Sequence, residues 1–424
     1  MVARKRIAVI GGGWAGLAAA VRAVGAGHAV TLLEMAPQLG GRARGVDVAG
    51  MVLDNGQHIL IGAYVDTLAL LRTVGVDVDR ALLRMPLRLV GANGAGLQLR
   101  AGAAMTAFAR GVLLQRGWAM GHRIALLAAA VGWAARGFRC DPALTVAALT
   151  ARLPQPVRDE LIDPLCVAAL NTPAHEASAT VFLRVLKDAL FSGPGSADLL
   201  LPRADLSALL PEPSKAWLTR SGATLRLQQR VGALAAQGDA WSVDGESFDG
   251  VVLAASAGEA ARLTNDIAPD WSRMAAALRY EPIVTVYLRS TGTRLPEPML
   301  ALRCDDRSPA QFVFDRGRLG GAEGLLAFVI SGAQPWVERG AQATSQAVIK
   351  QASAQLGAHL REPPQLVHTL TEKRATFRCT PALQRPLMQI ATGLCAAGDY
   401  VQGPYPATLE GAVRSGLAAA NAVM

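Results

Sequence analysis

Residues 53–62, LDNGQHILIG, place several polar side chains directly before an aliphatic run. The amide of Gln57 and the imidazole of His58 can bond polar atoms of a ligand, and an imidazole can also move a proton near neutral pH. Gly56 lets the backbone approach a ligand closely because it has no Cβ. The pattern therefore predicts a ligand site with the aliphatic residues that follow as one wall.

A glycine pattern near the N-terminus predicts a second part of a ligand site. Residues 6–10 are apolar and typical of a buried strand, and Gly11, Gly13 and Gly16 follow before a run of small apolar residues typical of a helix. In such a unit the first glycine allows a tight turn, the second lets a pyrophosphate approach the backbone, and the third lets helix and strand pack closely. The helix would begin at Trp14 and Ala15, where free amides would point at the phosphates.

Glu34 ends the next apolar stretch, residues 28–34. A carboxylate at this distance from the glycines is placed to accept hydrogen bonds from ribose hydroxyls. Strand, glycines, helix, strand and acid together predict a dinucleotide site. They do not choose between NAD and FAD, because both cofactors use this pattern.

A second glycine pair favours FAD. Residues 40–44 read GGRAR, which resembles the extended motif of flavoproteins in the flavin amine oxidase and phytoene desaturase superfamily. The resemblance implies that Gly41 and Arg42 run along the FAD pyrophosphate, and a guanidinium suits phosphate well. Because residues 53–62 follow this segment closely, the chain must return towards the flavin there, and Gly56, Gln57 and His58 are expected to contact it.

The C-terminal stretch 393–423 resembles the second flavin motif of the same superfamily. It reads as a strand, then Gly398 and Asp399, a loop, and a helix. The resemblance implies that Asp399 bonds the ribityl chain and that the backbone near Thr408 and Leu409 faces the pyrimidine end of the isoalloxazine. A helix N-terminus there would stabilise negative charge on the reduced flavin.

Two motifs at opposite ends of a 424-residue chain that build one site imply a discontinuous domain. We expect an α/β flavoprotein of the two-dinucleotide-binding-domain type, with a Rossmann-like FAD domain and a mixed sheet-plus-helical substrate domain. The FAD domain would comprise 1–90, 206–262 and 389–424, with Val231 near the adenine. The substrate domain would comprise a helical insertion, 91–205, and a sheet part, 263–388.

Composition and charge limit which classes of protein and which binding partners fit this chain. Hydrophobic residues make up 51% and charged residues 18%, so the chain is globular rather than disordered. The formal charge of +9 comes from scattered arginines without basic blocks or interleaved aromatics, which argues against nucleic-acid binding. Five cysteines without a CxxC pair fit a reducing compartment. We expect a cytoplasmic protein, and no metal site is predicted.

Residues 124–135 carry no charge and lie between two arginines. A run this short cannot span a bilayer. Together with residues 105–120 it could lie on a membrane surface, at the inner face of the plasma membrane, with its arginines at headgroup level. Alternatively, both stretches could be buried helices of the substrate domain. The sequence leaves these two interpretations open.

A closer resemblance covers nearly the whole chain. The stretches 53–71, PLCVAALNTP (164–173), EKRATF (372–377) and the C-terminal motif together resemble the bacterial hydroxysqualene dehydroxylases of squalene and hopanoid synthesis. The resemblance implies reduction of hydroxysqualene to squalene by reduced FAD, with release of water. It also implies a long-chain isoprenoid substrate in an apolar tunnel and an electron donor that the sequence does not identify.

The departing hydroxyl would need an acid. His58 is the first candidate for that acid, or for the group that holds it, and Asp163 is the second. Cys166 and Asn171 would also come from the helical side of the site, with a structural role as the alternative for each. Lys373 is either a lysine beside the flavin or a solvated charge on a strand.

Three alternatives stay open. An amine oxidase would carry an aromatic residue where Thr408 stands, and Tyr400 and Tyr405 are out of register for that role. An oxidative carotenoid-type desaturase would share fold, cofactor and greasy substrate. A non-catalytic flavin-binding or lipid-carrying protein would be distinguished by a turnover assay.

Overall fold

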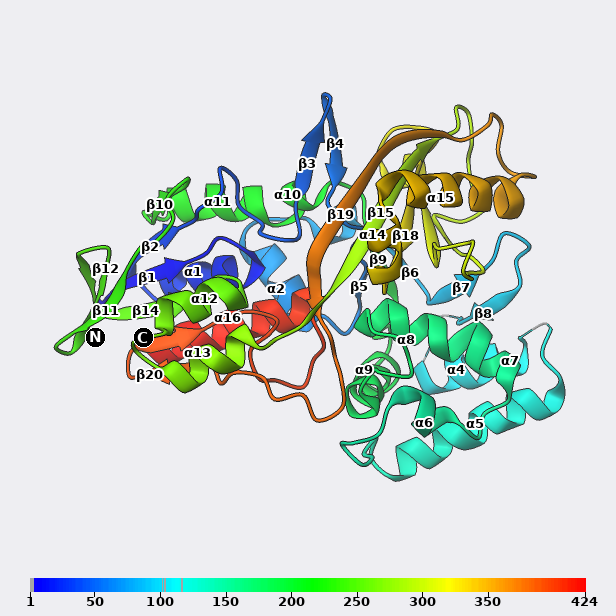
Figure 1. The fold of residues 1–424 in the computed structure, drawn as a ribbon, viewed down its shortest axis with the longest axis horizontal. Coiled ribbons are helices and arrows are strands. Elements are labelled where there is room, and N and C mark those ends of the chain that lie inside the picture. The colour runs from blue at the N-terminus through cyan, green and yellow to red at the C-terminus, as the bar shows by residue number, and fades with distance from the viewer. Residues whose placement is uncertain (1–3, 101, 103, 116) are drawn as a thin grey trace.

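The computed structural model describes residues 4–100, 102, 104–115 and 117–424. One lobe, at the left of Figure 1, is built on a six-stranded sheet whose strands are almost entirely apolar. All neighbouring strands pair in parallel except the last two, which are antiparallel. In spatial order the strands are β10 (Thr224–Arg226), β2 (Ala29–Leu33), β1 (Arg6–Ile10), β14 (Gly250–Leu253), β21 (Leu394–Ala396) and β20 (Gln389–Ala391).

The inner strands of this sheet are largely buried, as their continuous apolar runs predict. Helices pack on one face, and the small three-stranded sheet of residues 234–248 contacts β1 and β14 from the other face. The first helix, α1 (Trp14–Gly25), packs against the last, α16 (Leu409–Val423). Their close approach depends on Gly416, where a Cβ would lie 2.1 Å from the carbonyl oxygen of Ala15. The other helices of this lobe are α2 (Val65–Thr73), α3 (Val78–Ala81), α10 (Leu206–Leu209), α11 (Pro211–Arg220), α12 (Ala257–Thr264) and α13 (Pro269–Ala276).

The second lobe contains an antiparallel five-stranded sheet at the upper right of Figure 1. Its order is β16 (Met299–Ala301), β17 (Phe312–Asp315), β18 (Leu325–Ile330), β15 (Tyr280–Arg289) and β19 (Gln365–Phe377). Helices α14 (Gln334–Arg339) and α15 (Ala341–Leu356) pack on one face. The long strands β15 and β19 run from this sheet towards the first lobe (Figure 1).

A helical layer lies below this sheet (Figure 1). It consists of α4 (Ala104–Leu113), α5 (Met120–Ala135), α6 (Val146–Thr150), α7 (Gln155–Val157), a π-helical turn (Arg158–Ile162), α8 (Asp163–Leu170) and α9 (Ala179–Phe191). No helix within the described residues has the length and apolar character needed to cross a bilayer.

Small sheets and hairpins complete the fold. One sheet orders β5 (Leu60–Ile61), β9 (Leu199–Pro202) and β6 (Leu82–Met85). The others are β3 (Gly45–Val48) with β4 (Met51–Asp54), β7 (Arg88–Val90) with β8 (Gly96–Gln98), and β11 (Leu234–Gln237), β12 (Ala240–Val243) and β13 (Glu246–Phe248).

The predicted fold class, α/β with a Rossmann-like sheet and a second part made of a sheet and helices, is confirmed. The six strands of the parallel sheet come from within the three segments predicted for the FAD domain. However, β5 and β6 from residues 1–90 pair with β9 from the predicted insertion. The domain boundaries themselves therefore stay a prediction.

Candidate active site

One large cavity of about 690 Å³ lies between the lobes. Glycine-rich loops of the parallel-sheet lobe line one end. Apolar side chains of α4, α5, α8 and α9 line the other end, and the face of the second sheet opposite α15 closes the side between them. The cavity therefore joins a dinucleotide-type loop to an apolar chamber.

Of the three glycines after β1, two are required by contacts within the protein and one by space for a ligand. Gly11 has φ +109°, and a Cβ there would lie 2.5 Å from the carbonyl oxygen of Ala254. A Cβ on Gly16 would lie 1.9 Å from the carbonyl oxygen of Gly11. A Cβ on Gly13, by contrast, would have its nearest protein atom 3.9 Å away, and Gly13 lies on the cavity wall. The protein needs glycine at 11 and 16, whereas a glycine at 13 is explained by a ligand that packs against it.

The amide end of α1 fits the phosphates of such a ligand. Gly13 is the N-cap of α1 without a side-chain cap, and the first turn holds no acidic residue. Trp14 and Ala15 lie on the cavity wall, and the indole of Trp14 donates to the carbonyl of Ala43 over 3.0 Å. The helix N-terminus thus offers amides and a positive dipole end to the cavity.

Glu34 positions the glycine loop. Its carboxylate accepts hydrogen bonds from the amides of Gly12 at 2.6 Å and Ala36 at 2.7 Å, and it lies on the cavity wall. Val231 lines the same end of the cavity. Nearby, the backbone N–H of Gln229 donates to the backbone carbonyl of Glu34. The residues predicted to hold the ribose and the adenine are therefore neighbours.

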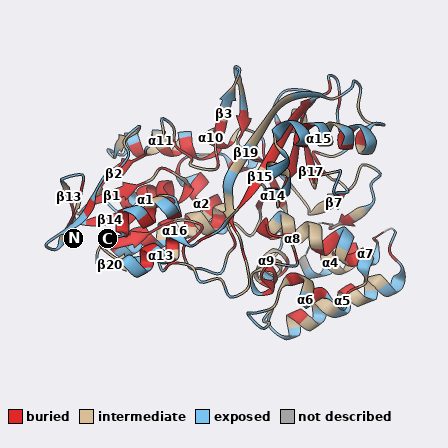
Figure 2. Cartoon of the chain, in the orientation of Figure 1, coloured by how far each residue is buried: buried red, intermediate tan, exposed pale blue. Residues whose placement is uncertain are grey.

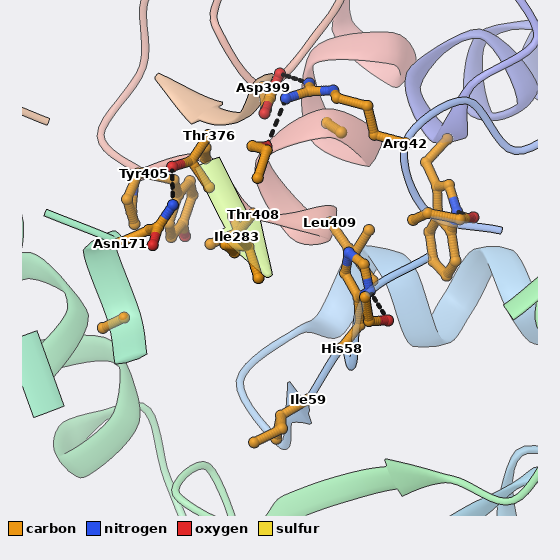
Figure 3. Close-up of a pocket in the computed structure, with 18 of the residues that line it drawn as sticks. Arg42, His58, Ile59, Asn171, Ile283, Thr376, Asp399, Tyr405, Thr408 and Leu409 are labelled. Carbon is orange, nitrogen blue, oxygen red and sulfur yellow. Dashed lines mark hydrogen bonds and ion pairs between the residues drawn. The ribbon is translucent and has the colours of Figure 1, made fainter. Parts of the chain in front are cut away.

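The structure brings together the arginine of the GGR segment and the acid of the C-terminal motif. Arg42 donates to Asp399 at 2.5 Å and to the carbonyl of Ala375 at 2.7 Å, and Figure 3 shows both side chains at the cavity. Burial and this ion pair act in opposite directions on the guanidinium, and the pKa of Arg42 is raised on balance. Gly41 lies beside Gly13, with a Cβ position 3.2 Å from the Gly13 Cα.

A buried hydroxyl next to Asp399 is an unexpected feature. Tyr400 lines the cavity, is almost fully buried, and its hydroxyl has no hydrogen-bond partner among the residues that the structure describes. A buried polar group without a partner is costly. A polar cofactor in the cavity would satisfy it, which is a second observation that fits the dinucleotide.

The last helix begins where the C-terminal motif predicts. Thr408 is the N-cap of α16 and accepts a hydrogen bond from the amide of Gly411, and both Thr408 and Leu409 line the cavity next to Gly398. Glu410 turns away and accepts hydrogen bonds from the amides of Asp66 and Thr67 at the start of α2. The positive end of α16 therefore faces the cavity without a carboxylate in front of it.

Part of the polar segment 53–62 is a structural network between the lobes. Asp54 lies 3.6 Å from Arg316 and accepts a hydrogen bond from the amide of Leu206. Gln57 donates to the hydroxyl of Tyr287 at 2.8 Å and accepts from Arg316 at 3.1 Å. Desolvation, opposed by Arg316, raises the pKa of Asp54 to about 6. Gln57 also lines the cavity with Gly56, so its contact with a cofactor stays a prediction.

His58 faces the cavity but is poorly suited to be the acid. Its Nδ1 lies 3.0 Å from the carbonyl oxygen of Gly56, as Figure 3 shows. Burial lowers the pKa of His58 below its ordinary value, and the Gly56 carbonyl opposes this only in part. A neutral ring that donates from Nδ1 leaves Nε2 as an acceptor. The side chain can therefore hold a hydroxyl, but it carries no spare proton.

Three of the proposed residues do not lie on the cavity wall: Asp163 and Cys166 of the helical layer, and Lys373 of β19. Asp163 is off the wall, although Ile162 and Leu165 line it, so its role as the acid stays a prediction. Cys166 is buried and donates to the carbonyl of Thr172, and burial raises the pKa of its thiol to about 12. Lys373 is exposed, which fits a solvated charge on a strand.

Asn171 lines the cavity but is committed to the protein. It ends α8 in a left-handed conformation, φ 47°. Its side chain donates to the carbonyl of Glu281 and the hydroxyl of Thr376 and accepts from the amide of Gly332. These bonds fasten α8 to the second sheet, which is a structural role.

The sequence did not reveal a polar cluster on the chamber wall. Tyr405 and Asp188 both line the cavity, and Arg184 donates to the Tyr405 hydroxyl at 3.3 Å and to Asp188 at 2.9 Å. The guanidinium groups of Arg184 and Arg414 lie 5.1 and 5.0 Å from the centre of the Tyr405 ring. Burial raises the pKa of Tyr405, so the phenol is protonated at neutral pH.

The rest of the chamber is apolar. The helical layer, the second sheet and the strands β8 and β9 contribute the apolar side chains that line it: Leu97, Phe108, Leu126, Trp133, Leu161, Leu165, Leu190, Leu199, Phe312 and Phe314. Such a wall excludes water and binds a hydrocarbon through burial of apolar area.

Comparisons with known proteins agree with this geometry. The family described as flavin containing amine oxidoreductase matches residues 14–424. Hydroxysqualene dehydroxylase of Rhodopseudomonas palustris is 29% identical over 99% of this chain and 98% of its own length. Hydroxysqualene dehydroxylase of Zymomonas mobilis is 24% identical over 97% of each chain. A probable zeta-carotene desaturase of Synechococcus elongatus is 39% identical, but over only 16% of this chain.

Solved structures share the fold. An oxidoreductase from Methanosarcina mazei superposes with a TM-score of 0.71 at 16% identity and covers 97% of this chain and 99% of its own. Cyclohexylamine oxidase from Brevibacterium oxydans has a TM-score of 0.71 at 15% identity, with 99% of each chain covered. At this identity the similarity concerns the architecture alone.

Proposed function

This chain belongs to the flavin-containing amine oxidoreductase family, and we propose that within this family it uses FAD to reduce hydroxysqualene to squalene. It is an FAD-dependent oxidoreductase. One observation carries the finer proposal: a single cavity joins the dinucleotide loops to an apolar chamber. Near full-length similarity to several hydroxysqualene dehydroxylases supports the choice of substrate.

The residues that would hold FAD follow from the geometry. Gly13 and the amides of Trp14 and Ala15 suit the pyrophosphate, together with Arg42 beside Gly41. Asp399 suits the ribityl chain, and the backbone at Thr408 and Leu409 suits the pyrimidine end of the isoalloxazine. Gly11 and Gly16 shape the loop, Glu34 and Val231 suit the adenosine end, and Gly398 lies on the wall near Asp399.

When bound and reduced, FAD supplies a hydride. In the proposed reaction the allylic C–O bond breaks, the hydride joins the carbon that carried oxygen, and a proton joins the departing hydroxyl to give water. Hydroxide leaves poorly, so the proton must come from a placed acid. The apolar wall keeps water from the cationic carbon until the new C–H bond forms.

Tyr405 is the group in the chamber best suited to give that proton. Its phenol is protonated at neutral pH, because burial and the carboxylate of Asp188 raise its pKa. The guanidinium groups of Arg414 and Arg184 act in the opposite direction and favour the negative charge that develops as the proton leaves. His58 Nε2 is available to accept a hydrogen bond from the substrate hydroxyl and orient it. The proposal therefore moves the acid role from His58 and Asp163 to Tyr405.

Each turnover consumes two electrons, so a separate reductant must reduce the flavin again. We therefore propose an external electron donor as a partner of the enzyme. We place the protein in the cytoplasm at the inner face of the plasma membrane, where a long isoprenoid would be dissolved.

Anaerobic reoxidation tests the direction of the reaction. Photoreduced enzyme mixed with hydroxysqualene should regain the oxidised flavin spectrum and form squalene in equal amount, whereas squalene should leave the flavin reduced. Stopped-flow absorbance and product extraction measure both. If oxidised enzyme instead desaturated squalene without a reductant, the oxidative desaturase would replace the reductive proposal.

Tyr405→Phe should slow flavin reoxidation by hydroxysqualene by about 10²-fold or more, the usual contribution of a placed acid. FAD content and flavin reoxidation by oxygen should not change, because neither needs the phenol. Tyr280→Phe is the matched control, since Tyr280 lines the same cavity near Arg42. Equal rates in Tyr405→Phe and the wild type would remove Tyr405 from the mechanism.

A further inference from the structure

We propose that the outer face of α5, with the turn between α4 and α5, rests on an anionic lipid bilayer, and that the chamber opens into that bilayer beside α4. The docking surface comprises Met105, Leu113, Leu114, Met120, Ile124 and Val131. The surface stands on its own observations. The passage of an isoprenoid through it rests on the proposed function.

Exposed apolar side chains gather on this surface. Six of the eleven large hydrophobic residues that are exposed in the described chain lie between residues 105 and 131. Val131 is 68% exposed and Leu114 is 62% exposed. Single exposed apolar residues are ordinary, but a contiguous group marks an interaction site.

The spacing on α5 makes the group one continuous face. The exposed residues Met120, Ile124, Ala128, Val131 and Ala135 recur every three or four positions and lie on one side of the helix. Figure 2 shows α5 at the lower edge of the molecule with exposed stretches along it. No side chain on this stripe is polar, so its natural environment is apolar.

The opposite side of α5 faces the chamber. Leu126 and Trp133 are buried, and with Ala130 they line the cavity. A helix that is apolar on both faces is typical of one with an apolar environment on each side. For α5 one environment is the chamber, and the other is the proposed bilayer.

The chamber reaches the surface at this place. Met105 on α4 lines the cavity and is also 56% exposed, and Phe108 one turn later lines the cavity as well. A residue that is both wall and surface marks a mouth. This mouth lies within the exposed apolar group, so a hydrocarbon could enter without crossing water.

The positive charge around the docking surface indicates that it binds an anionic membrane. Between residues 99 and 140 the sequence contains six arginines and no aspartate or glutamate. Arg110, Arg136 and Arg139 are exposed on α4 and at the end of α5, whereas Arg116 lies outside the described residues. Arginines around an apolar face attract anionic headgroups. One exposed carboxylate reaches the turn between α4 and α5, where Glu160 accepts a hydrogen bond from the indole of Trp118 at 2.8 Å, and the arginines of this stretch outnumber it.

Vesicle flotation tests the docking surface. The holoenzyme should float with vesicles of phosphatidylglycerol and phosphatidylcholine, and binding should weaken with salt and with phosphatidylcholine alone. Ile124→Glu/Val131→Glu should lower the bound fraction at least about tenfold, because two carboxylates enter the interface. Leu366→Glu/Leu387→Glu is the matched control: it adds the same charge at two exposed leucines outside the surface and should float like the wild type.

Turnover measurements in detergent and in vesicles distinguish a failure of the docking surface from a failure of the proposed reaction. In detergent, Ile124→Glu/Val131→Glu should turn over hydroxysqualene at the wild-type rate, and with substrate in vesicles it should be slower by the loss in binding. Wild type that stays unbound, or a variant that floats like it, overturns the docking surface. The docking surface is also overturned if the wild type is a dimer and Ile124→Glu/Val131→Glu is a monomer, because the face would then join two copies of the chain. Absence of turnover in detergent with normal flotation contradicts the reaction and leaves the surface supported.

Discussion

Replacing Gly13 by valine should give a folded protein that has lost its FAD. The backbone at Gly13, φ −74° and ψ −179°, suits valine, and a Cβ there meets no protein atom closer than 3.9 Å. The added side chain would instead occupy the space where a pyrophosphate lies against the loop. We expect FAD affinity to fall by about 5- to 150-fold, since overpacking a close contact costs about 1–3 kcal/mol.

The comparison that isolates this effect is with deflavinated wild type. Bound cofactor stabilises a protein by mass action, so Gly13→Val should melt at the temperature of the apoprotein and below that of the holoprotein. Gly16→Val is the contrasting variant. Its Cβ would lie 1.9 Å from the Gly11 carbonyl, so it should fail to fold. A Gly13→Val protein with full flavin content would disprove the phosphate site.

Removing Arg316 should strongly destabilise the folded protein. Arg316→Met leaves the buried Asp54 carboxylate without its cation, and breaking a buried ion pair in this way costs about 3–5 kcal/mol. Gln57 also loses a donor, so the contact between the lobes weakens. The shift of the urea unfolding midpoint at about pH 8 measures the loss.

The loss should depend on pH. The folded-state pKa of Asp54, about 6, is above its ordinary value, so the folded protein holds this proton more tightly than the unfolded chain. Stability from this group is present at low pH and is lost as the pH rises through about 6. Without Arg316 the folded pKa rises further, so the variant should lose more at about pH 8 than at about pH 5.

Asp54→Asn/Arg316→Met is the control, because a neutral amide no longer needs the cation. It should recover much of the lost stability at about pH 8 and show little dependence on pH. Equal destabilisation at both pH values, or no recovery in the double variant, would show that charge pairing is not what Arg316 contributes.

The flavin half of the site was predictable because its determinants are local. The sterics of Gly11 and Gly16 involve only the strand, the turn and the helix that the motif itself encodes. The same holds for the end of α16, where Thr408 caps the helix from within the motif. Nearby residues fix such geometry, so spacing alone predicts it.

The catalytic half was less predictable because it depends on helix phase and distant contacts. Asp163 begins α8 directly after a π-helical turn, and the rotation at that turn decides which side chains face the chamber. Tyr405 meets Arg184 across 221 positions of sequence. Gln57 is predicted from the sequence as a ligand contact, but its side chain bonds to Arg316 and Tyr287 of the other lobe, which the sequence does not place beside it.

The order of strands in the parallel sheet also fixes when FAD can first bind during synthesis. β21 pairs with β14, and α16 packs on α1, yet both come from residues 394–424, far along the chain from β1. The glycine loop after β1 is therefore synthesised long before Asp399 and the start of α16, and the apolar face of α5 is exposed during that interval. A nascent chain of this protein would need protection by chaperones or by the membrane before it could need a cofactor.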